Sequence, residues 1–183
     1  MKVEKTAFEG LFVIKPSVFG DSRGYFFESF NHRVFNELTG LNIDFIQDNE
    51  SMSGYGVIRG LHYQLPPYGQ SKLVRVVAGV VLDVALDLRP DSETFGKHFS
   101  ILLDEENKVQ VLIPKGFAHG YSVLSETAVF AYKCDAYYKK SSETGILLND
   151  NDLNIDWKIP EDKRNISEKD LQQRSFKDHI PYI

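Results

Sequence analysis

Two short segments of the chain each place a histidine close to glycines. Arg59-Gly60-Leu61-His62-Tyr63-Gln64 brings a guanidinium, an imidazole and an amide into six residues, and Pro114-Lys115-Gly116-Phe117-Ala118-His119-Gly120 puts a histidine after a Pro-x-Gly turn. An imidazole has an ordinary pKa of about 6.5, so it suits proton transfer near neutral pH. A lone histidine in a β-rich chain is more often structural. Two histidines that each lie close to glycines favour a functional site, but they do not identify a reaction.

Carboxylates and a phenol are the next candidates. Asp83 and Asp87 fall on one face of an otherwise apolar segment, and Tyr132 follows Phe130 on the same side of another. If the face with Asp83 and Asp87 lines a barrel, both carboxylates are desolvated and need partners. A solvent-exposed strand face is the alternative for the two aspartates. Core packing is the alternative for Tyr132.

The histidines do not complete a metal site. A mononuclear cupin site uses a His-x-His pair and a glutamate besides a later histidine. Here Tyr63 and Gln64 follow His62, although Pro114-x-Gly116-x-x-His119 matches the later motif. Catalytic zinc or iron needs about three protein ligands. We therefore expect the fold of a cupin without a catalytic metal, and no other cofactor.

Strand patterns dominate the segments that must position these groups. Residues 72–89 predict two strands with a turn near Gly79, and Val80 to Leu88 alternates with the period of two typical of a strand. Further strands are expected at Leu11–Ile14, Tyr25–Phe30, Phe99–Leu103, Val109–Ile113, Tyr121–Leu124 and Thr127–Lys133. Many short strands predict a mainly β fold, an antiparallel barrel or double-sheet jelly roll with a pocket at its mouth.

Helix signals are few. One short helix is expected over His32 to Leu38, closed by Gly40, and a second over Glu168 to Gln173 with Ser167 as its N-cap. We expect residues 1–183 to form a single domain with extended N-terminal strands and a short helical C-terminal segment.

The bulk composition narrows the setting of the protein. A net charge of −5 argues against non-specific nucleic-acid binding, which needs a broad basic surface. There is one cysteine, Cys134, so no intramolecular disulfide can form. No apolar run has the roughly 18 residues of a membrane span, and the first residues do not resemble a signal peptide. We expect a cytoplasmic enzyme.

The sequence closely resembles the dTDP-4-dehydrorhamnose 3,5-epimerase family, cupin-fold enzymes of dTDP-L-rhamnose synthesis. The resemblance covers nearly the whole chain, and the order of the matching segments carries it. These segments are Phe19–Phe30, Gln47–Asn49, Arg59–Gln64, Lys72–Val76, Asp83–Val84, Ile113–Gly120, Tyr132–Lys133, Tyr137–Tyr138 and Ser167–Asp170.

The resemblance implies a metal-independent epimerase that inverts C3 and C5 of dTDP-4-dehydro-6-deoxy-D-glucose. Both carbons flank a ketone that acidifies their hydrogens. His62 then suits the base, Lys72 the cation that stabilises the enolate, and Tyr132 the acid on the opposite face. Asp170 is implied to hold the imidazole of His62, and Asp83 is an alternative for that role.

The resemblance also implies a set of substrate-binding residues. Arg23 and Arg59 are expected at the diphosphate or the sugar hydroxyls, and Glu28 at the thymine edge. Aromatic faces are expected from Phe19, Phe26 and Tyr138, with core packing as the alternative for the two phenylalanines. The set is completed by Gln47, Asp48, Asn49, His119, Glu143 and Lys169.

Two departures from the family pattern stand out. Cys134 occupies a position where threonine is frequent, and residues 139–142 lack the usual proline, which puts the position of Glu143 in doubt. The resemblance further implies a homodimer in which N-terminal strands extend the partner's sheet. Alternative functions are a mono-epimerase of another dTDP-deoxysugar pathway, a non-catalytic cupin that binds sugar nucleotides, and a metal-dependent cupin oxygenase.

Overall fold

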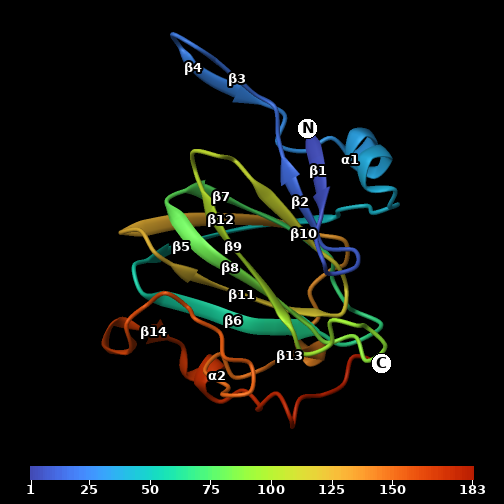
Figure 1. Cartoon of the computed structure of the whole chain (residues 1–183), viewed down its shortest axis with the longest axis vertical. Coiled ribbons are helices and arrows are strands. Elements are labelled where there is room, and N and C mark those ends of the chain that lie inside the picture. The colour runs from blue at the N-terminus through green and yellow to red at the C-terminus, as the bar shows by residue number, and fades with distance from the viewer.

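The computed structural model describes residues 1–183 and is built on two β-sheets packed face to face (Figure 1). The first sheet has the strand order β1 (Lys2–Lys5), β2 (Phe12–Lys15), β10 (Gln110–Ile113), β7 (Lys72–Ala78), β12 (Thr127–Cys134) and β5 (Gln47–Gly54). The second has the order β13 (Glu143–Gly145), β6 (Val57–Gln64), β11 (Phe117–Val123), β8 (Val80–Asp87) and β9 (His98–Asp104). A short strand, β14 (Asn165–Ile166), pairs with β6 in parallel. The predicted double-sheet jelly roll is confirmed.

The core between the sheets explains why β8 is apolar on both faces. Val81 and Ala85 pack toward the first sheet, whereas Leu82 and Leu86 pack against the C-terminal segment around Trp157. Asp83 and Asp87 share the inward face, and their exposed fractions are 1% and 0%. The alternative of a solvent-exposed aspartate face is therefore excluded.

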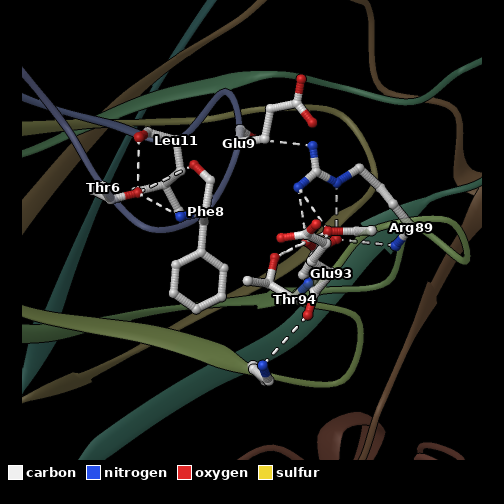
Figure 2. A network of polar contacts seen from close by, with 10 residues as sticks. Thr6, Phe8, Glu9, Leu11, Arg89, Glu93 and Thr94 are labelled. Carbon is white, nitrogen blue, oxygen red and sulfur yellow. Dashed lines mark hydrogen bonds and ion pairs between the residues drawn. The ribbon is translucent and has the colours of Figure 1, made fainter.

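Asp87 has a structural role at the end of β8. Its carboxylate accepts hydrogen bonds from Ser92, Thr94 and the guanidinium of Arg89. Arg89 also donates to the main-chain oxygen of Glu9, as Figure 2 shows. Burial alone would raise the pKa of Asp87, but these hydrogen bonds hold it below its ordinary value. The network joins two loops at this end of the barrel.

A separate hairpin stands away from the two sheets (Figure 1). It is formed by β3 (Val18–Asp21) and β4 (Gly24–Phe27), and both strands are exposed along nearly their whole length. The strand expected over Tyr25–Phe30 therefore ends at Phe27. Core packing is excluded for Phe19 and Phe26, since their exposed fractions are 65% and 71%.

Both predicted helices are present. The helix α1 (His32–Thr39) ends at Gly40, which has a left-handed backbone, and α2 (Glu168–Leu171) begins after Ser167, whose side chain accepts from the backbone N–H of Asp170. Two single turns of 3-10 helix cover Lys140–Ser142 and Glu161–Lys163. No helix combines the length and the apolar character that crossing a bilayer requires.

Candidate active site

Two adjoining cavities meet at three side chains, His62, Lys72 and Tyr132. The larger, of about 510 Å³, lies between the sheets, and the smaller, of about 260 Å³, opens toward β13. His62 comes from β6 of the second sheet, whereas Lys72 and Tyr132 come from β7 and β12 of the first. The imidazole and the phenol therefore approach from opposite walls. The Lys72 Nζ lies 5.9 Å from the centre of the Tyr132 ring.

A local irregularity in β6 brings both Arg59 and His62 to the cavity. Residues three apart on a regular strand point to opposite faces. Here the pairing of β6 with β11 shifts register, and Gly60 adopts a φ of +128°. A Cβ at position 60 would lie 2.5 Å from the Cα of Gly120, so this close approach of two backbones requires glycine.

Asp170 holds the imidazole of His62. Its Oδ1 lies 2.6 Å from Nε2 of His62, and its position is set by α2, which Ser167 caps. Burial alone would raise the pKa of Asp170, but the hydrogen bond and charge of His62 and the backbone of Gly60 bring it below its ordinary value. Asp170 is thus ionised at neutral pH and fixes the orientation of the ring.

Asp83 pairs with the other histidine. Its Oδ2 lies 2.7 Å from Nε2 of His119, and both side chains are buried. His119 is directly opposite His62 in the pairing of β6 with β11. Of the two aspartates considered as partners of His62, the structure brings Asp170 to it and gives Asp83 to His119.

Lys72 and Tyr132 are tuned mainly by burial. Burial lowers the pKa of Lys72, and the nearby Cys134 and Asp83 oppose that change. Burial also raises the pKa of Tyr132, so its phenol stays protonated near neutral pH. The ammonium of Lys72 forms no ion pair within the chain. It is free to contact an anionic oxygen in the cavity.

Arg59 is also free of carboxylate partners. Its Nε and Nη2 both donate to the hydroxyl of Ser53, at 3.1 and 3.0 Å. On the same inward face of β5, the hydroxyl of Ser51 lies 3.0 Å from that of Tyr121. Ser51, Ser53 and Tyr121 were not predicted as site residues, although the every-second-residue spacing that includes Gln47 and Asn49 could have identified the two serines.

The smaller cavity is lined by hydrogen-bonded polar groups. Gln47 donates to Asn49 and accepts from the backbone N–H of Tyr138. Glu143 accepts from Tyr138 and pairs with Lys169. Burial alone would raise the pKa of Glu143, but these two hydrogen bonds hold it below its ordinary value. The missing proline in residues 139–142 therefore does not remove Glu143 from the cavity.

Cys134 also lines the smaller cavity. Its side chain is buried, and burial raises the pKa of the thiol to about 11. A protonated thiol is a poor nucleophile. The position that departs from the family pattern is therefore filled by an unreactive side chain.

Some predicted binding residues lie elsewhere. Asp48 points to the outer face of the first sheet and pairs with Lys133, because successive residues of β5 alternate between faces. Asp48 therefore lines neither of the two cavities of its own chain, and its contact with the ligand stays a prediction. Arg23, Phe19 and Phe26 lie on the projecting hairpin, where Arg23 pairs only with Asp21, and Glu28 follows it.

The chain does not gather three or more His, Cys, Asp or Glu side chains in a group that could hold a metal ion. Each cavity histidine instead has one aspartate partner. The site offers imidazoles, a phenol and free cations, a set suited to proton transfer beside a carbonyl on an anionic substrate.

Comparison with known proteins agrees with this chemistry. Residues 5–178 match the family model described as dTDP-4-dehydrorhamnose 3,5-epimerase. An enzyme of that name from Shigella flexneri is 51% identical over 183 residues, which is 100% of each chain. The crystal structure of a dTDP-4-dehydrorhamnose 3,5-epimerase from Elizabethkingia anophelis has a TM-score of 0.93 and 56% identity, covering 97% of each chain. A dTDP-6-deoxy-D-glucose-3,5-epimerase from Legionella pneumophila, in complex with dTDP-4-keto-L-rhamnose, has a TM-score of 0.92 and 46% identity, covering 96% of this chain and 93% of that one.

Proposed function

Since the chain belongs to the dTDP-4-dehydrorhamnose 3,5-epimerase family, we propose that His62, Lys72 and Tyr132 are the groups that perform its reaction. The enzyme is an isomerase that converts dTDP-4-dehydro-6-deoxy-D-glucose to dTDP-4-dehydro-L-rhamnose. The observation that carries the assignment of roles is that these three side chains, from both sheets, line the same two cavities.

The stereochemistry of the sugar fits this arrangement. In a D-gluco ring the hydrogens on C3 and C5 lie on the same face, so one base can reach both carbons. Inversion requires that each proton return from the other face. His62 on the second sheet is the base, and Tyr132 on the first sheet is the acid. Asp170 keeps the imidazole in one orientation throughout.

Lys72 stabilises the intermediate. Removal of a proton at C3 or C5 places negative charge on the C4 oxygen, and a preorganised cation there lowers the barrier. The unpaired ammonium of Lys72 beside Tyr132 supports this role. Arg59, without a carboxylate partner, suits the diphosphate. Tyr138 offers an exposed ring for stacking on the thymine, and Gln47, Asn49 and Glu143 supply hydrogen bonds in the smaller cavity. Lys169 lines the larger cavity and pairs with Glu143.

Turnover in D₂O tests the reaction. The substrate is dTDP-4-dehydro-6-deoxy-D-glucose, and the product is read by NMR after trapping with a 4-keto reductase. Deuterium at both C3 and C5 is the expected result. Deuterium at only one carbon would establish a mono-epimerase, and an unlabelled, uninverted sugar would reject catalysis.

We further propose that the enzyme is a homodimer whose hairpins complete the sites of the partner subunits. The hairpin of β3 and β4 stands away from the two sheets (Figure 1). It carries Arg23, Phe19 and Phe26, which are exposed and line neither cavity of their own chain. An isolated two-stranded hairpin is marginally stable in water, and exposed aromatic residues are typical of interfaces. In this arrangement Arg23 reaches the diphosphate and Glu28 the base.

Complementation between variants tests the shared site. Arg23→Ala and His62→Ala enzymes are each expected to be weakly active. If Arg23 acts on the partner's site, a mixed dimer holds one intact site and activity returns on mixing. Activity that stays at the level of the separate variants, under conditions where subunits exchange by mass spectrometry, would reject the sharing. Analytical ultracentrifugation gives the oligomeric state directly.

We also propose that the enzyme is located in the cytoplasm. The single cysteine is buried and unpaired, which suits a reducing compartment. Activity that sediments with membranes or is released with periplasmic proteins on cell fractionation would contradict it.

A further inference from the structure

A second histidine–carboxylate pair lies beside the His62–Asp170 pair. His119 and Asp83 belong to neighbouring strands, β11 and β8, and their side-chain atoms approach to 2.7 Å. The two histidines face one another across the pairing of β6 with β11, and both line the larger cavity. Each takes its carboxylate at Nε2.

The burial of Asp83 has no explanation in packing. Its exposed fraction is 1%, and its inward-facing neighbours on β8, Val81 and Ala85, are apolar. Its Oδ1 is the only buried side-chain nitrogen or oxygen atom of the chain that has no hydrogen-bond partner. An under-satisfied buried carboxylate destabilises a fold, and an apolar residue of similar size is often better tolerated. Asp83 therefore points to a requirement of the site.

The contact with Asp83 defines which hydrogen bond His119 can offer. A carboxylate only accepts hydrogen bonds, so Nε2 of His119 carries the hydrogen and Nδ1 of the neutral ring carries a lone pair. Nδ1 makes no hydrogen bond within the chain, and it is not among the buried unpaired atoms, so it keeps some exposed surface. His119 lines the larger cavity. A lone pair at this point accepts from a hydroxyl.

We propose that Asp83 is a positioning residue that holds His119 as the Nε2–H tautomer and so presents Nδ1 as the acceptor for a hydroxyl group of the hexose. The His119–Asp83 pair recognises the substrate, whereas His62 and Tyr132 carry out the proton transfers. This proposal rests on the proposed function, since it takes the sugar half of the substrate to occupy the larger cavity. A pocket that requires a hydroxyl donor rejects sugars that lack it, because His119 would be left without a partner.

A double-mutant cycle with Asp83→Asn and His119→Ala tests the proposal. We expect Asp83→Asn to lower kcat/KM by about tenfold or more, because the amide can donate to Nε2 and change the tautomer. If Asp83 acts only through His119, the double variant is no slower than His119→Ala alone. Affinity for dTDP, which lacks the hexose, should stay within about twofold of wild type. The proposal would be overturned if the losses of kcat/KM in the two single variants multiplied in the double variant. Full activity of Asp83→Asn would also overturn it.

Two further readouts separate positioning from a structural role. In ¹⁵N-histidine NMR of the ligand-free wild-type enzyme, His119 should appear as the Nε2–H tautomer. In Asp83→Asn, the tautomer of His119 should change. A different tautomer in the wild type would reject the proposal independently of any activity measurement. Asp83→Asn should also keep or raise the Tm. Asp87→Asn is the matched control on the same face of β8, with a lowered Tm but an unchanged His119 tautomer. An inactive wild type in D₂O would instead reject the proposed function.

Discussion

His62 and His119 are directly opposite each other on β6 and β11, and each is held through Nε2 by its own aspartate. The two aspartates come from different parts of the fold. Asp83 lies inside the barrel on β8, whereas Asp170 lies on α2 and packs onto β6 from the C-terminal segment. One cavity thus contains two oriented imidazoles. Because each has a different aspartate partner, substitutions of the aspartates can test the two histidines separately.

Replacing His62 by alanine should remove the base. We expect turnover to fall by about 10²–10⁴, the usual contribution of a general base, while dTDP binding measured by calorimetry changes little. An equal loss of nucleotide affinity would mean that His62 is chiefly a binding contact.

Replacing Tyr132 by phenylalanine should separate proton removal from inversion. The base remains, so deuterium from D₂O still enters C3 or C5 on the original face, but the inverted product is lost because the phenol that protonates the other face is missing. NMR of the recovered substrate measures this exchange. Normal yields of inverted product would transfer the role of acid to another group.

Replacing Lys72 by methionine keeps the length of the side chain and removes its charge. We expect kcat to fall by about 10²–10³, as for other donors to a developing oxyanion. Because burial lowers the pKa of Lys72, its charge should also be lost at a lower pH than that of an ordinary lysine, so kcat should decline on the alkaline side. The pH profile of kcat checks this, and Arg59→Met, which keeps Lys72, should retain that decline.

Asp87 should contribute to stability in a pH-dependent manner. Its pKa is depressed in the folded state, so its stabilisation is fully present above the unfolded-state pKa of about 3.9 and is lost as the pH falls through the lower folded value. Asp87→Asn should cost about 1.5–3 kcal/mol at neutral pH, the usual range for hydrogen bonds to a charged group. Urea unfolding of the variant and the wild type at pH 7 and pH 3 gives the difference in their free energies of unfolding at each pH. A difference of the same size at the two pH values would contradict the prediction.

Much of the fold was predictable because its core strands alternate clearly. The strands of residues 72–89 and both helices follow directly from period and capping. The strand β5 escaped prediction because its inward residues are the polar Asn49, Ser51 and Ser53, which give no hydrophobic alternation.

The site was harder to predict, since its partners are distant in sequence. Asp83 is 36 residues from His119 and Asp170 is 108 from His62, and no local pattern says which carboxylate meets which imidazole. Asp48 was included because it stands between Gln47 and Asn49, and the alternation of β5 turns it outward.

The carboxylate that orients His62 belongs to α2. This helix is the last element of the chain and follows every strand of the two sheets. A polypeptide still emerging from the ribosome can therefore close both sheets and remain catalytically silent until the last helix docks. Proteolytic trimming of that segment should likewise switch off chemistry before it unravels the barrel, which makes activity a more sensitive reporter of an intact chain than any spectroscopic measure of β-structure.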